Sequence, residues 1–168
     1  MFCARSSSVS DFQDNILKVL NICVDSLRKS TSAKNILLRT TTFNAKVEEL
    51  NGFQPVTKVA DYKDLVCSGR TALFDAVYSA IGASAEYAKK LTESDYSVNA
   101  IIFILTDGED LDSTFGPSEI KKIISDIAGR EEIGNLITVL VGVNDSDPKL
   151  NGFLLSFKEK AGLSQYVS

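Results

Sequence analysis

The chain alternates repeatedly between two hydrophobic periods, one typical of strands and one typical of helices. Two short runs, residues 100–105 (AIIFIL) and 136–143 (LITVLVGV), are almost entirely apolar, which is typical of strands covered on both faces. Around them lie segments whose apolar residues repeat at helical spacing. A chain that switches repeatedly between these periods is expected to form a mostly parallel sheet with helices packed on it.

The two hydrophobic periods predict where the strands and helices lie along the chain. The predicted strands cover residues 1–4, 35–43, 45–50, 100–105, 136–143 and 165–167. The predicted helices cover residues 10–29, 72–91 and 117–128, and a last one between Asp147-Pro148 and Gly162. This order predicts an α/β fold: a doubly wound, mostly parallel central sheet with helices on both faces and one antiparallel edge strand. The length of 168 residues predicts a single domain over residues 1–168.

Composition removes several classes of function. The chain has 18 basic and 22 acidic residues, a formal net charge of −4 and no histidine. Histidine-dependent nucleophiles and imidazole metal sites are therefore excluded, and a nucleic-acid partner is not expected. Cys3, Cys23 and Cys67 form no CxxC pair, so we predict reduced thiols and a cytoplasmic location. No apolar run approaches a membrane span, so no membrane partner is expected.

Three polar segments fall where a ligand of such a sheet should bind. Ser6-Ser7-Ser8 follows the first strand, residues 69–71 precede the second helix, and residues 106–110 (TDGED) follow the strand at 100–105. In open α/β sheets, ligands bind outside the carboxyl ends of the strands. Hydroxyl and carboxylate oxygens are the ligands that hard cations such as Mg²⁺ prefer. Thr71 could alternatively cap the second helix, and the serines could be an ordinary polar loop.

The segments RSSSVS, SGRTALFDAV and IIFILTDGED resemble the three loops of a von Willebrand factor A (vWA) domain. The resemblance implies a Rossmann-like vWA fold with a metal-ion-dependent adhesion site. It assigns Ser6, Ser8, Thr71 and Asp107 as ligands of Mg²⁺, or of Mn²⁺ or Ca²⁺. The family's first aspartate falls on Ala4, and loss of an orienting carboxylate costs about 10–100-fold in metal affinity. The metal site is therefore expected to be weakened or lost.

The resemblance implies a non-enzymatic module for protein–protein interaction, in which an acidic residue of a protein partner completes the metal site. It also implies that both ends are trimmed relative to the family. One alternative is a structural or assembly domain with no active metal site. The other is a Mg²⁺-dependent phosphohydrolase using Asp107 and Asp110, which the absence of a phosphate-binding glycine motif disfavours.

Four further acidic residues lie near the second and third loops, and none of them is among the metal ligands that the resemblance predicts. Asp75 lies in the first turn of a helix, where a carboxylate is favoured, and we expect a structural role for it. Glu109, Asp110 and Asp112 are predicted to form a solvated rim.

Overall fold

The computed structural model describes residues 1–4, 13–44, 47–64, 71–106, 110–130, 133–143 and 147–167. Its strands form one sheet in the order β3-β2-β1-β4-β5-β6. The strands are β1 (Phe2–Ala4), β2 (Leu37–Phe43), β3 (Val47–Pro55), β4 (Asn99–Thr106), β5 (Asn135–Gly142) and β6 (Gln165–Val167). The helices are α1 (Gln13–Lys29), α2 (Leu73–Thr92), α3 (Pro117–Ala128) and α4 (Pro148–Ala161), with two short 3₁₀ turns, η2 (Ala33–Asn35) and η3 (Val56–Lys58).

The direction of each strand follows from its pairing. β1 lies in the middle of the sheet and pairs in parallel with both β2 and β4. β4 pairs in parallel with β5, and β5 with β6. β3 is antiparallel to β2 at the edge of the sheet. The order of strands and helices along the chain agrees with the sequence prediction, and so does the antiparallel edge strand.

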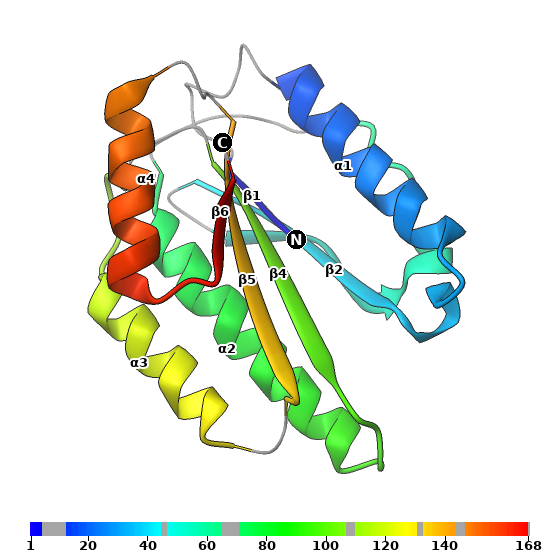
Figure 1. Ribbon diagram of the computed structural model, residues 1–168. Helices are drawn as coiled ribbons and strands as arrows, with labels where there is room; N and C mark the ends of the chain where they lie inside the picture. Colours follow the sequence, from blue (N-terminus) through cyan, green and yellow to red (C-terminus); the bar gives the residue numbers. More distant parts are fainter. Residues whose placement is uncertain are drawn as a thin grey trace.

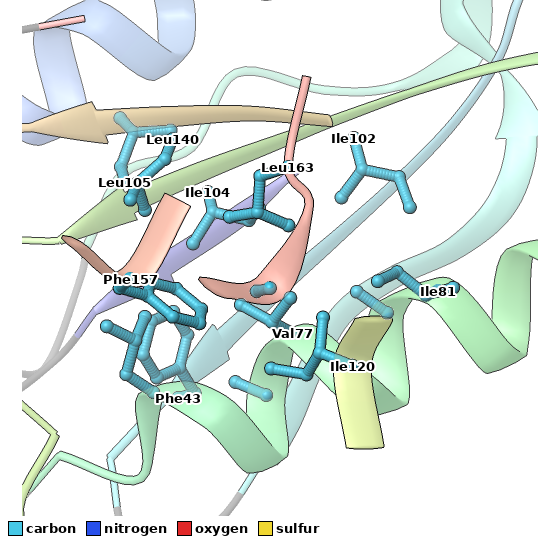
Figure 2. Packing of buried hydrophobic residues seen from close by; sticks show 14 of the residues in the cluster. Phe43, Val77, Ile81, Ile102, Ile104, Leu105, Ile120, Leu140, Phe157 and Leu163 are labelled. Carbon is cyan, nitrogen blue, oxygen red and sulfur yellow. The ribbon is translucent and has the colours of Figure 1, made fainter. Parts of the chain in front are cut away.

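The helices are divided unevenly between the two faces of the sheet. Figure 1 shows α2, α3 and α4 together on one side and α1 alone on the other. The main core lies under the three helices, where Val77 and Ile81 of α2 pack with Ile104 of β4 and Phe157 of α4 (Figure 2). A smaller cluster lies beneath α1 and contains Val24, Leu38, Val56 and Val59.

The prediction of a doubly wound, mostly parallel sheet that helices cover along both faces is wrong, although α1 does lie on the opposite face from the other three helices. The apolar runs in β4 and β5 predict cover on both sides, but Ile101 is 58% exposed and Phe103 is 42% exposed. Their neighbours Ile102 and Ile104 are buried on the other face. In the described residues, Ile101, Phe103 and Ile137 leave part of one face of β4 and β5 exposed, whereas Leu105 and Val139 on that same face are buried. The chain has a small α/β fold with a mixed sheet.

The ends of α4 lie where the sequence predicts them, at Asp147-Pro148 and Gly162. The Asp147 carboxylate accepts hydrogen bonds from the backbone N–H groups of Lys149 and Leu150, as a helix cap requires. Gly162 follows the helix with φ of 69°, a left-handed conformation that glycine adopts without steric cost. None of the helices in the described ranges is long and apolar enough to cross a membrane. The cytoplasmic location stays a prediction.

Candidate functional site

The candidate site lies at the carboxyl end of the central strands. Because β1 and β4 are parallel neighbours, with Cys3 opposite Leu105, they finish at the same end of the sheet. Residues 5–12 and 107–109, which follow these strands, lie outside the described residues. β2 is also parallel to β1 and finishes there, with Phe43 opposite Ala4. We call this region the carboxyl end of the sheet.

The start of α2 is fastened to this carboxyl end. The backbone N–H of Ala72 donates to the carbonyl oxygen of Asn44, just after β2, at 2.9 Å. The carbonyl oxygen of Thr71 accepts from the N–H of Leu111 at 2.9 Å. Thr71 is 2% exposed. The two hydrogen bonds hold the residues before α2 between the end of β2 and the segment after β4.

The first turn of α2 is capped by a distant segment. Ala72 precedes the helix and offers no capping side chain, so the first N–H groups of α2 need other acceptors. Phe74 N–H donates to the Asp110 carboxylate at 3.1 Å, and Asp75 N–H donates to the Ser113 hydroxyl oxygen at 3.1 Å. Thr71 is therefore not the cap of this helix.

The Asp75 side chain of α2 is also hydrogen-bonded to the segment that follows β4. Its carboxylate accepts from the backbone N–H of Thr114 at 3.0 Å and of Phe115 at 2.8 Å. The Ser113 hydroxyl donates to Asp110 at 2.5 Å, and the Phe115 ring stacks on Tyr78 of α2 with centroids 4.2 Å apart. We call Asp75, Asp110 and Ser113 the loop clamp. It fixes the chain that follows residues 107–109 to the rigid first turn of α2.

The loop clamp settles two predictions about acidic residues. Asp75 has the structural role that was expected for it. Asp110 was assigned to a solvated rim, and that is wrong, because its carboxylate is half-buried and accepts hydrogen bonds from Phe74 and Ser113. Asp112 is exposed, as predicted, and Glu109 lies outside the described residues. Ser113 was missed, although an aspartate three residues before a serine is a common local turn signal.

Of the four predicted metal ligands, the structure describes Thr71, which lies at the carboxyl end of the sheet. Ser6, Ser8 and Asp107 lie outside the described residues. Ala4, which occupies the position of the missing aspartate, is the last residue of β1. Among the described residues there is no group of three or more cysteine, aspartate or glutamate side chains placed to hold a metal ion. The donor set of hydroxyls and one carboxylate is chemically suited to a hard cation, and its assignment stays a prediction.

No protein-family model matches the chain, and no curated protein matches it. The solved structures that share its fold include the following two. A point mutant of the PilB minor pilin from Streptococcus sanguinis aligns with a TM-score of 0.65 at 13% sequence identity, over 99% of this chain and 55% of the pilin. The ArnB paralog VWA2 from Sulfolobus acidocaldarius aligns with a TM-score of 0.55 at 16% identity, over 99% of this chain and 40% of that one.

Identities this low show a shared fold and nothing about activity. The chain has a fold like that of VWA2, which agrees with the resemblance drawn from the three loops. It spans 55% of the length of the pilin and 40% of the length of VWA2.

Proposed function

We propose that the chain is a vWA-type, non-enzymatic module for protein–protein interaction, and that its binding surface is the carboxyl end of the sheet. The observation that carries the proposal is the meeting of β1, β4 and the start of α2 at that end. Segments that leave neighbouring parallel strands present their side chains together, and ligands of open α/β sheets bind at this place.

The loop clamp supports a binding role for this surface. A recognition surface loses less entropy on binding when its backbone is already fixed. The hydrogen bonds of Asp75, Asp110 and Ser113 join the segment after β4 to α2, which is 20 residues long and well packed in the core. The two segments should therefore keep their spacing when a partner approaches.

We include a weakly bound metal ion in the proposed binding surface. Ser6, Ser8, Thr71 and Asp107 are the residues that would hold Mg²⁺, Mn²⁺ or Ca²⁺. The bound ion would supply a positive contact for an acidic residue of the partner. Ala4 can neither accept a hydrogen bond from an adjoining hydroxyl nor orient metal-bound water, so affinity for the ion falls by about 10–100-fold.

Thermal unfolding with and without MgCl₂ or MnCl₂ tests the metal assignment. We would compare the wild-type chain, the Ala4→Asp variant, and a variant carrying both Ala4→Asp and Asp107→Ala. A ligand that binds only the folded state stabilises it by about 2.7 kcal/mol at 100 times its Kd. We expect stabilisation of Ala4→Asp, little of wild type, and none of the double variant.

Two results would contradict the proposal. Equal stabilisation of the single and the double variant would place the ion elsewhere on the chain. Hydrolysis of a simple phosphate ester that disappears in Asp107→Ala would show an enzyme instead of a binding module.

A further inference from the structure

A groove of about 580 Å³ lies between α2 and α3. The two helices lie side by side in Figure 1 and run in the same direction. Near their beginnings, the Tyr78 ring of α2 stacks on Phe115, which lies just before α3. Further along, Gly82 of α2 lies beside Ile123 of α3. Small and apolar residues form the floor of the groove, and charged side chains form its rim.

The floor of the groove holds space that packing within the chain does not require. Gly82 lies in the interior of α2, where glycine is destabilising relative to alanine. Among the described residues, a Cβ atom at this position would meet only the Cδ1 of Ile123, at 3.7 Å, which is an ordinary contact. Alanine would therefore fit here in a single chain. The missing side chain instead allows a second helix to approach the backbone of α2 closely.

Four exposed side chains of alternating charge line the α3 side of the groove: Glu119, Lys122, Asp126 and Arg130. Their spacing of three or four residues makes them neighbours on the surface of the helix. At such a spacing Glu86 and Lys90 of α2 form an ion pair of 3.3 Å. None of the four residues on α3 forms an ion pair with another described residue. Their charges are therefore available to a partner.

A row of alternating charges is complementary to a reversed copy of itself. When a second α3 lies antiparallel to the first, Glu119 meets Arg130 of the second copy, and Lys122 meets its Asp126. Glu119 caps its own helix with Oε2, so Oε1 is the oxygen that meets the guanidinium group. A two-fold axis midway along α3 makes each of these pairs twice, which is the geometry of an isologous dimer.

The charges of α2 match those of α3 in sign along the groove. Both helices rise equally per residue, so the contact at Gly82 sets the level of every residue after it. Glu86 of α2 lies at the level of Asp126, and Lys89 lies at the level of Arg130. The rim of the groove is therefore acidic on both helices at the first level and basic on both at the second.

We propose that the groove binds α3 of a second copy of this chain, and that the chain forms a two-fold symmetric dimer through α2 and α3. Lys122 of the second copy enters the acidic level of the groove, and its Glu119 enters the basic level. Six of the eleven residues that line the groove are charged. Permanent interfaces are more apolar than this, so the dimer is reversible and is weakened by salt. None of these residues belongs to the predicted metal site, so the inference does not depend on it.

Sedimentation equilibrium over a range of protein concentrations tests the dimer. For the wild-type chain we expect a monomer–dimer equilibrium in low salt, with a dissociation constant that rises several-fold in about 0.5 M NaCl. Lys122→Glu and Asp126→Lys each bring like charges together across the two-fold axis, so each variant alone should dimerise at least 10-fold more weakly. An equal mixture of the two variants restores opposite charges at both contacts and should form a heterodimer. Lys18→Glu, at an exposed position of α1, is the matched control and should change nothing.

Substitution of Gly82 tests the floor of the groove. Gly82→Gln places a side chain where the second copy approaches the backbone of α2, so it should weaken the dimer at least 10-fold. A Cβ atom at Gly152 of α4 would meet no described atom within 4 Å. Gly152→Gln is therefore the matched control and should leave the dimer unchanged. Circular dichroism shows whether each variant is folded.

Three results would overturn the proposal. The first is a wild-type chain that stays monomeric in low salt at every concentration tested. The second is equal weakening of the dimer by Lys122→Glu and Lys18→Glu. The third is a mixture of Lys122→Glu and Asp126→Lys that forms no heterodimer.

Discussion

Asp75 and Asp110 each hold the other's segment of chain. Asp110, after β4, accepts from the N–H of Phe74 in the first turn of α2, and Asp75 of that turn accepts from the N–H groups of Thr114 and Phe115. The two carboxylates are 35 positions apart in the sequence. Their exchange of contacts makes the end of β4 and the start of α2 one rigid unit, which is the base of the proposed binding surface.

Removing one carboxylate of the loop clamp should destabilise the protein. Asp75→Ala leaves the N–H groups of Thr114 and Phe115 without their acceptor, and each net hydrogen bond to a charged group contributes about 1.5–3 kcal/mol. Because these groups are partly exposed to solvent, we expect a total loss of about 1–2 kcal/mol in urea unfolding.

Asp126→Ala, at an exposed position of α3, is the control for Asp75→Ala and should change the free energy of unfolding by less than about 0.5 kcal/mol. Equal effects of the two substitutions would show that the loop clamp contributes nothing specific.

Because one face of β4 is buried and the other is partly exposed, we expect different losses of stability when two isoleucines of this strand are replaced by alanine. Ile104 is fully buried against the helices, so Ile104→Ala should cost about 2–5 kcal/mol. Ile101 is largely exposed, so Ile101→Ala should cost less than about 1 kcal/mol. The two variants make the same chemical change on one strand, and chemical denaturation compares them directly. Similar costs would mean that both faces of β4 are covered.

The hydroxyl of Tyr62 predicts a dependence of stability on alkaline pH. Burial is the largest influence on this side chain and raises the pKa of Tyr62 above its ordinary value of 10.0. Below pH 10 the tyrosine is neutral in both states, and its full contribution to stability is present. Above pH 10 the unfolded chain loses this proton more readily, so stability falls as the pH rises toward the folded pKa.

Tyr62→Phe should therefore remove part of the alkaline loss of stability. At neutral pH it should also cost about 1–2 kcal/mol, because Thr40 and Asn51 lose a hydrogen-bond partner. Tyr96→Phe, at an exposed tyrosine, is the control. If Tyr62→Phe and wild type lose stability equally between pH 9 and 11, burial does not shift the pKa of this residue.

Local rules predicted the parts of the fold that depend on neighbouring residues. Asp147 and Gly162 delimit α4 because a cap needs only the residues beside it. The strand predicted over residues 45–50 stops before Asn51 and Gly52, but β3 continues through them to Pro55. The pairing of β3 with β2 is irregular there, and the Asn51 amide donates to the carbonyl of Leu38. A bulge of this kind uses the same residues as a turn.

Other features depended on contacts that no local pattern contains. The run at 100–105 was apolar at every position, and hydropathy alone does not show whether the chain itself covers both faces. The role of Asp110 depends on Phe74, which lies 36 positions away. The three loops of the site are predicted from their motifs and stay a prediction, while the described strands and helix next to them meet at one end of the sheet.

Locating the bound ion on the chain tests whether the proposed binding surface holds the metal. Mn²⁺ broadens the signals of nearby amide groups in a ¹⁵N spectrum, so substoichiometric MnCl₂ would be added to labelled wild-type chain and to Ala4→Asp. We expect Thr71 and Leu111 to lose intensity first, at lower Mn²⁺ in Ala4→Asp than in wild type, while Leu155 keeps its intensity. Losses centred on Glu86 or Asp126 of the helices, with Thr71 unaffected, would contradict it.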